Sequence, residues 1–195
     1  PNFKLIEQIA SECWVPITYG GGIKSIQDAR RIFNCGVEKA LIQDLMFDNF
    51  DVAKSLVSAF GSASIVGCIN VKKNFFAQYC IHGNDLRVKR NVSLDNTIDL
   101  LKELDIGELV VNNISRDGTF RGYDLELLSY VSNKMSCPVI ALGGAKDIKD
   151  LHMGIKRGAH AVAAGAMFVF SNGDKESVLV NFPERRLIEE VFGYG

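Results

Sequence analysis

The chain lacks the features that mark several large classes of protein. It has 195 residues and a formal net charge of −1, so no excess of one charge points to nucleic acid or to a polybasic membrane contact. No apolar run approaches the roughly 20 residues that a membrane-spanning helix requires. No signal peptide is visible. These absences favour a globular protein of the cytoplasm.

Cysteine and histidine occur without the spacing of a disulfide framework or a metal site. The five cysteines are scattered and form no CxxC pair. An odd, scattered set is typical of reduced, mostly buried thiols in the cytosol. The three histidines show no ligand spacing. We therefore expect no metal and no cofactor.

What the chain does contain is a long internal repeat. Residues 14–42 align without a gap to residues 136–164, so that Pro16 matches Pro138 and Gly36 matches Gly158. The two copies lie 122 residues apart, which is too long for one unit of a solenoid. The repeat predicts two equivalent halves and a complete protein of about 244 residues.

Short apolar runs and helical patterns alternate along the chain. Each run is bounded by Gly, Pro or polar residues, which is typical of buried parallel strands. We expect strands over 15–19, 39–43, 64–70, 108–113, 138–142 and 161–166. We expect helices over 3–12, 25–35, 49–60, 93–105, 124–134, 147–157 and 176–190, with Ser25, Asp48, Ser93 and Asp147 among the capping residues. Residues 71–92 predict a small hairpin centred on His82–Asp85.

Six strand–helix units allow either a doubly wound sheet or a (β/α)8 barrel. The repeat favours the barrel, because two equal halves of four units make eight. We therefore expect residues 1–195 to form a single partial (β/α)8 TIM barrel domain of the α/β class, with strands three to eight present and strands one and two missing. The first residue is Pro and not Met, so we expect the start to be a fragment boundary.

In such a barrel the active site lies at the carboxyl ends of the strands. Two strands run into glycines, which permit positive φ and close approach of a ligand to the backbone. Amides in such turns, followed by a helix N-terminus, can hold an anion. The sequence therefore favours two phosphate pockets related by the repeat, against the simpler interpretation as tight turns. The candidate residues are Gly21, Gly22, Gln43 and Asp44 in the first half, and Gly143, Gly144, Gly165 and Ala166 in the second.

A long loop rich in charge and glycine follows the run 108–113. Its length and composition suit ligand contact, although Asp124 at its end also fits a helix cap. The candidate substrate-binding residues here are Asn112, Arg116, Asp117, Gly118 and Thr119.

Asn70 ends the run 64–70, at a position where a barrel enzyme can place an acid or a base. Its counterpart under the repeat falls on the missing first strand. Asparagine cannot transfer a proton at neutral pH and can only orient a ligand through hydrogen bonds. The alternative interpretation is a polar strand end.

The glycine turns, the hairpin after Asn70, the segment Ser115–Asp124 and the repeat together resemble one family. It is the cyclase subunit (HisF) family of imidazole glycerol phosphate synthase, and the resemblance covers essentially the whole chain. Arg116–Thr119 alone is shared with the sister phosphoribosyl isomerase of the same pathway. The continuation Gly122–Asp124 favours the cyclase, and so does Asn113, where the isomerase would carry an aspartate.

The resemblance implies a TIM barrel of the histidine-biosynthesis type and an ammonia-dependent lyase or cyclase. A glutaminase partner would dock at the amino-terminal barrel face near Glu38, Lys39 and Glu108. Ammonia would cross the barrel and convert a two-phosphate ribonucleotide (PRFAR) to imidazole glycerol phosphate and AICAR. Lys39 and Glu108 would gate ammonia entry, and Thr18 would line the channel. The simpler interpretation of the two charges is a solvated surface.

Departures from the family pattern bear on the chemistry. Asn70 stands where the family has a catalytic aspartate, Gln43–Asp44 replaces an Asn-Thr pair, and Leu142 replaces a small polar residue. Two unit charges about 4 Å apart cost about 4 kcal/mol at an effective dielectric near 20. Asp44 must therefore point away from a bound phosphate, bind a cation, or mark a different ligand.

The departures favour a paralogous group that occurs with its own glutaminase in surface-polysaccharide gene clusters. That group is thought to deliver ammonia for an acetamidino group on a nucleotide-linked sugar. Two alternatives stay open. One is the sister isomerase, and the other is a non-catalytic barrel that activates a glutaminase.

Overall fold

The computed structural model describes residues 1–87, 89–170, 178 and 182–193. The strands are β1 Thr18–Gly20, β2 Lys39–Ile42, β3 Ile65–Lys73, β4 Tyr79–His82, β5 Glu108–Asn113, β6 Val139–Leu142 and β7 Ala161–Val162. The helices are α1 Phe3–Glu12, α2 Ile26–Asn34, α3 Asp44–Asp48, α4 Phe50–Phe60, α5 Leu94–Leu104, α6 Leu125–Ser132, α7 Ile148–Lys156, α8 Ala166–Val169 and α9 Arg185–Phe192, with a 3-10 turn η1 at Ser62–Ser64. None of the described helices is long and apolar enough to cross a bilayer.

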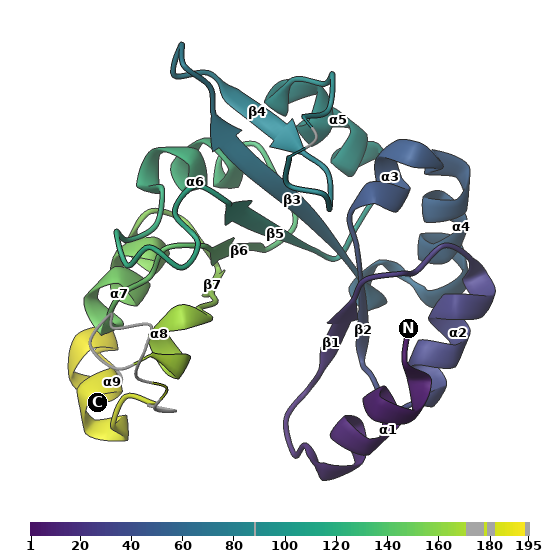
Figure 1. Cartoon of the computed structure of the whole chain (residues 1–195), viewed down its shortest axis with the longest axis horizontal. Helices are drawn as coiled ribbons and strands as arrows, with labels where there is room; N and C mark the ends of the chain where they lie inside the picture. The colour runs from purple at the N-terminus through teal and green to yellow at the C-terminus, as the bar shows by residue number, and fades with distance from the viewer. Residues whose placement is uncertain (88, 171–177, 179–181, 194–195) are drawn as a thin grey trace.

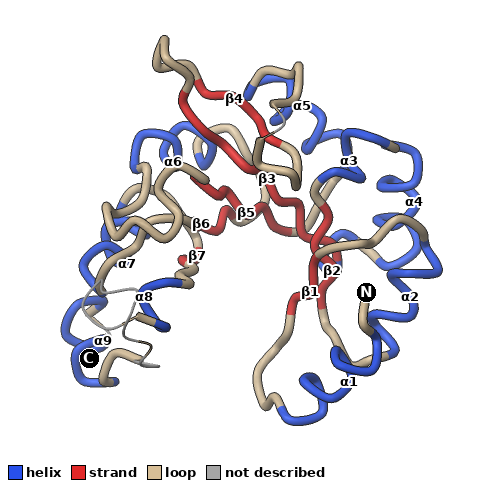
Figure 2. Tube along the Cα trace, viewed as in Figure 1, coloured by secondary structure: helices blue, strands red, loops and turns tan. Residues whose placement is uncertain are grey.

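The described strands form one sheet whose parallel order is β1-β2-β3-β5-β6-β7, and β4 pairs antiparallel with β3. The strands line the inside of an arch, and the helices cover its outside (Figures 1 and 2). The α/β class and the parallel half-barrel sheet are consistent with a TIM-type barrel. That two further strands complete the barrel stays a prediction.

Side-chain caps begin most of the helices where the sequence predicts them. Ser25, Ser93 and Asp147 each accept a hydrogen bond from an amide in the first turn of the helix that follows. Asp48 as a cap is wrong, because it is the last residue of α3 and Asn49 caps α4 instead. The expected helix 176–190 lies partly outside the described residues, and α9 covers its end.

The predicted hairpin forms, but its turn lies at residues 74–78 and not at His82–Asp85. The side chain of Asn74 builds this turn, since its Oδ1 accepts hydrogen bonds from the amides of Phe76 (2.9 Å) and Gln78 (3.0 Å). After β4 the chain reverses again, and an isolated bridge joins His82 to Lys89.

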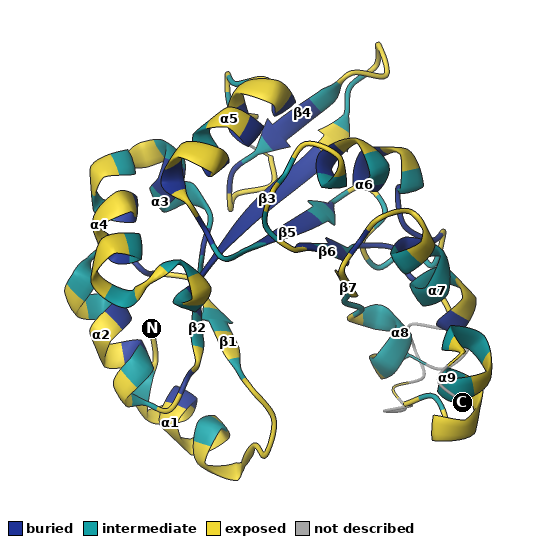
Figure 3. Cartoon of the chain, turned by 180° about the vertical axis from the view of Figure 1, so that it is seen from behind, coloured by how far each residue is buried: buried dark blue, intermediate teal, exposed yellow. Residues whose placement is uncertain are grey.

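Apolar side chains pack on both faces of the sheet. Successive residues of a strand face opposite sides, so β3 is buried along most of its length (Figure 3). The larger cluster joins the sheet to the outer helices and includes Ile32, Leu56, Ile69 and Leu101. A smaller cluster lies on the concave face, where Val66, Cys68 and Val110 are packed by Leu41, Ile140 and Leu142.

Candidate functional site at the two ends of the sheet

The two predicted ammonia-gate residues and the predicted channel residue Thr18 lie at the amino-terminal end of the sheet. Lys39 Nζ donates a hydrogen bond to Glu108 Oε1 across the intervening strand β3. The two side chains are 32% and 24% exposed, so the pair is shielded on most sides. Thr18 is the register partner of Lys39 on β1. The structure therefore brings these residues to one edge, while their role as a gate stays a prediction.

Glu38 and an exposed aromatic residue lie at the same end. Glu38 Oε2 accepts a hydrogen bond from the amide of Ile17 (2.5 Å), which fixes the approach to β1. In the loop between α1 and β1, the Trp14 side chain is 99% exposed and Val15 is 67% exposed. The sequence analysis missed Trp14, because a lone tryptophan in a loop carries no motif. Exposed tryptophan is a common anchor of protein interfaces.

The middle of the concave face is apolar. Its cluster of Val66, Cys68 and Val110 lies between the charged pair at one end of the strands and the amide side chains at the other. Burial raises the pKa of the Cys68 thiol to about 12. The middle of this face therefore carries no charged side chain within the cluster.

Iodoacetamide should alkylate Cys13 in the native protein and leave Cys68 unmodified. Cys13 is exposed. Burial raises the pKa of Cys68 from 9.0 to about 12, so the fraction of Cys68 present as thiolate at neutral pH is about a thousandfold lower than for an unburied thiol. Mass spectrometry of peptides after a timed reaction measures both rates. Equal rates would contradict the closed packing of this apolar cluster, and urea-unfolded protein, in which both cysteines should react, is the control.

Asn70 and Asn112 form a hydrogen-bonded pair on adjacent strands at the carboxyl end of this face. Asn112 Nδ2 donates to Asn70 Oδ1 at 3.0 Å, and Asn70 Nδ2 donates to the carbonyl of Gly83 at 3.3 Å. Asn70 is only 5% exposed. Asn112 Oδ1 is buried and has no partner within the described part of the chain. An ionised aspartate at position 70 could not donate a hydrogen bond to the Gly83 carbonyl. The asparagine therefore has a structural role at this position.

Asp44 turns toward the segment that follows β4. Its carboxylate accepts hydrogen bonds from the amide of Asn84 at 3.1 and 3.0 Å and from Arg90 Nη2 at 2.5 Å. The sequence leaves three possibilities for Asp44. In the structure its carboxylate pairs with a positively charged side chain of the same chain, Arg90.

Arg90 is a residue that the sequence analysis missed. Its Nη1 also donates to Asp48 Oδ1 at 2.7 Å, and this hydrogen bond lowers the pKa of the Asp48 carboxyl. Its guanidinium lies 4.7 Å from the centre of the Phe47 ring. Asp44 and Arg90 are 46 residues apart in the chain, so no local pattern could have linked them.

The two glycine turns share a backbone conformation but differ in their surroundings. Gly21, Gly22, Gly143 and Gly144 all have positive φ, between 71° and 109°, as predicted. Gly143 and Gly144 are buried, whereas Gly21 and Gly22 are exposed. A Cβ at Gly144 would lie 2.4 Å from the carbonyl oxygen of Gly122. Only glycine lets the loop after β5 close over the second turn.

The loop after β5 uses several of its own side chains to hold its shape. Arg116 Nη1 donates to the carbonyls of Arg121, Gly122 and Tyr123, each at 3.1 Å. The Thr119 hydroxyl donates to the Arg116 carbonyl at 2.6 Å.

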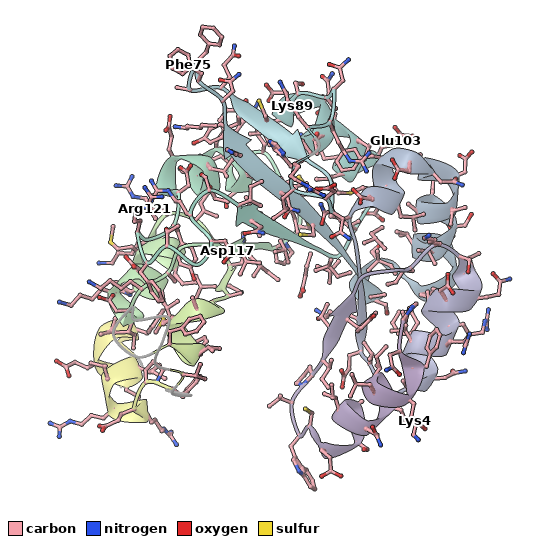
Figure 4. All side chains as sticks on the ribbon, in the orientation of Figure 1. Lys4, Phe75, Lys89, Glu103, Asp117 and Arg121 are labelled. Carbon is pink, nitrogen blue, oxygen red and sulfur yellow. The ribbon has the colours of Figure 1, made fainter. Side chains whose placement is uncertain are left out.

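Asp117 and Arg121 extend from this loop toward solvent (Figure 4). Gly118 has a φ of 67°. The amides of Arg116, Asp117, Thr119 and Gly122 already donate to backbone carbonyls. The exposed Asp117 side chain is therefore a group that a ligand can contact without breaking these hydrogen bonds.

A cavity of about 550 Å³ lies beside the same loop. It is lined by Lys73, Asn113, Ser115, Arg116, Arg121, Gly122, Tyr123, Asp124, Leu125, Glu126, Asp150 and Met153. Lys73 and Glu126 form an ion pair at 2.7 Å in its lining, and Arg116 donates to backbone carbonyls. It contains neither Asn70 nor either glycine turn, so we do not assign the candidate substrate site to it.

The candidate pair Gly165–Ala166 lies where β7 leads into α8. Gly165 is exposed, and a Cβ placed on it would meet no atom within 4 Å in the part of the chain that the structure describes. The repeat makes this pair equivalent to Gln43–Asp44. The second half therefore carries the small residue Ala166 where the first half has the paired carboxylate of Asp44.

Residues 1–174 match the model of one protein family, described as histidine biosynthesis protein. The chain belongs to this family. It is 36% identical over 194 residues to a protein of Leptospira interrogans named "Putative imidazole glycerol phosphate synthase subunit HisF", which covers 98% of this chain and 76% of the relative.

Two further relatives bear related names. A Pseudomonas aeruginosa protein, "Putative imidazole glycerol phosphate synthase subunit hisF2", is 38% identical over 186 residues, or 94% of this chain and 73% of the relative. "Imidazole glycerol phosphate synthase subunit HisF" of Dictyoglomus thermophilum is 34% identical over 166 residues, which cover 85% of this chain and 66% of the relative. These findings confirm the family resemblance that the motifs carry.

Proposed function

We propose that the protein is the barrel subunit of a glutamine-dependent, two-component enzyme of the imidazole glycerol phosphate synthase type. The observation that carries the proposal is the order of groups along the concave face. An ion pair lies at the amino-terminal end, an apolar cluster in the middle and a pair of amides at the carboxyl end. This order suits the passage of neutral ammonia from one end of the strands to the other.

A glutaminase would dock at the amino-terminal end and release ammonia beside Lys39 and Glu108. The protruding Trp14, with Val15, would supply the apolar anchor of that interface, and Glu38 would lie at its polar edge. The names of the relatives as synthase subunits support a partner of this kind.

At the carboxyl end, ammonia would meet a phosphorylated substrate held by the second glycine turn, Gly165–Ala166 and the loop after β5. In the histidine pathway that substrate is the two-phosphate ribonucleotide PRFAR, which yields imidazole glycerol phosphate and AICAR. In the paralogue it is a nucleotide-linked sugar that receives an amidino nitrogen. The hydrogen bonds of Asn70 favour the paralogue, because this residue anchors Gly83 and cannot transfer a proton.

Purified full-length protein is expected to bind a glutaminase subunit of this synthase type from the same organism and to raise that enzyme's glutamine hydrolysis about tenfold or more. Calorimetry measures the binding, and glutamate release measures the hydrolysis. Absence of both effects would contradict the proposal and favour the sister isomerase, which acts without a glutaminase.

Trp14→Ala should weaken binding of the glutaminase about tenfold or more, as expected for an aromatic anchor. Phe75→Ala is the matched control, because Phe75 is 98% exposed but lies at the tip of the hairpin, far from the helix that carries Lys4 (Figure 4). Equal effects of the two substitutions would place the interface elsewhere.

A further inference from the structure

The internal repeat allows the two halves of the carboxyl end to be compared residue by residue. Gly21–Gly22 correspond to Gly143–Gly144, and Gln43–Asp44 correspond to Gly165–Ala166. A symmetrical site would offer each half the same ligand group. The two halves nevertheless carry different residues at the second pair of positions, where Gln43–Asp44 corresponds to Gly165–Ala166.

In the first half, the Asp44 carboxylate accepts hydrogen bonds from donors that could otherwise bind an anionic group of the ligand. The Asn84 amide and the Arg90 guanidinium both donate to Asp44. A backbone amide and a guanidinium are also the donors that bind phosphate oxygens well. The Asp44 side chain is 34% exposed and the Arg90 side chain 20%, so the pair lies partly within the protein.

The segment that supplies the Asn84 amide is itself tied down. Gln43 Nε2 donates to the carbonyl of His82 at 3.3 Å, and Asn70 Nδ2 donates to the carbonyl of Gly83 at 3.3 Å. The ends of β2 and β3 therefore hold His82–Asn84 beside Asp44. In the second half, Ala166 replaces the carboxylate, and a Cβ on Gly165 would meet no atom of the described residues within 4 Å.

We infer that the Asp44–Arg90 ion pair restricts the ligand to one phosphate-type group, held by the second half, while the first half receives an uncharged part of the ligand. The inference rests on the proposed function for the second-half site. It names the ligand class: a molecule with a single phosphate or a contiguous diphosphate, and not one with a phosphate at each end. Asp44 and Arg90 are then the residues that determine specificity.

The test counts phosphate sites on the full-length protein. Inorganic phosphate is titrated by isothermal calorimetry, with thermal unfolding of each variant as a check of folding. The wild type should bind one phosphate. Asp44→Asn should bind a second at least about tenfold more tightly than the wild type does, because the Asn84 amide and the Arg90 Nη2 donor become available.

Asp48→Asn is the matched control, because Asp48 also pairs with Arg90 but does not contact the Asn84 amide. It should keep a single site. If Asp44→Asn does not fold, Asp44→Thr takes its place.

Two equivalent phosphates on the wild type would overturn the inference, and so would a single site on both the wild type and Asp44→Asn. No site on the wild type and one on Asp44→Asn would support the inference while removing the proposed second-half pocket. No site on either protein would overturn both. The count thus separates failure of the inference from failure of the proposed function.

Discussion

Gly143→Ala is expected to destabilise the protein by about 1–3 kcal/mol more than Gly21→Ala. The two glycines occupy equivalent positions of the repeat, and their φ angles are 94° and 109°. Alanine therefore pays a similar backbone strain at both. A Cβ at Gly143 would lie 2.7 Å from the Asn113 carbonyl oxygen and 2.8 Å from Asn112 Oδ1, whereas a Cβ at Gly21 would meet no described atom within 4 Å.

The same substitution should weaken phosphate binding by the second half, because Asn112 and Asn113 must shift to make room. Urea unfolding of both variants measures the stability difference, and a phosphate titration measures the binding. Equal losses of stability at the two positions would contradict the close contact between the second turn and β5. Gly21→Ala serves as the control for strain without overlap.

Asn70→Asp is expected to cost about 1–3 kcal/mol of stability at neutral pH and to create no new activity. Asn70 is buried, and its Nδ2 donates to the Gly83 carbonyl. A carboxylate would place a negative charge against that oxygen and leave the oxygen without its donor. The Asn112 amide would still donate to the new side chain, so the loss is confined to the Gly83 side.

Urea unfolding measures this loss, and hydrogen exchange at Gly83 and Asn84 should become faster as the segment loosens. Asn96→Asp makes the same chemical change at an exposed position of α5 and should stay within about 0.5 kcal/mol of the wild type. An unchanged stability together with new turnover would show that Asn70 replaces a catalytic acid without any structural purpose.

The fold could be predicted well where a helix or strand has both a clear side-chain pattern and another element to pack against. The helix expected over 3–12 is observed at Phe3–Glu12, and 108–113 is strand β5 throughout. The run 161–166 is shorter than predicted, since β7 pairs with β6 only over Ala161–Val162 before β6 itself ends at Leu142. Alanine and glycine beyond that point have little side chain to bury, so no packing extends the strand.

The candidate site was predictable where it depends on backbone conformation. Positive φ at the glycine turns follows from residue type, and the offset of the repeat aligns the two halves without any structure. The partners of Asp44 and Asn70 were not predictable, because Arg90 and Gly83 lie in the segment after β4. The hairpin that places this segment turns elsewhere than expected. Likewise, Arg116 reads as a ligand contact in sequence but holds three carbonyls of its own loop.

The central claim is that ammonia crosses the concave face from a glutaminase to the substrate. An isotope competition tests it in the complex of full-length protein and glutaminase, with amide-¹⁵N glutamine, excess unlabelled ammonium and either candidate substrate. Lys39→Ala removes one member of the ion pair at the amino-terminal end. Lys54→Ala is the matched control, because Lys54 forms an exposed surface pair with Glu103.

The account predicts that the amidated product carries mainly ¹⁵N in the wild type and in Lys54→Ala, and that Lys39→Ala dilutes the label toward the bulk ammonium value. A wild-type product with the isotope ratio of the bulk ammonium would contradict the account.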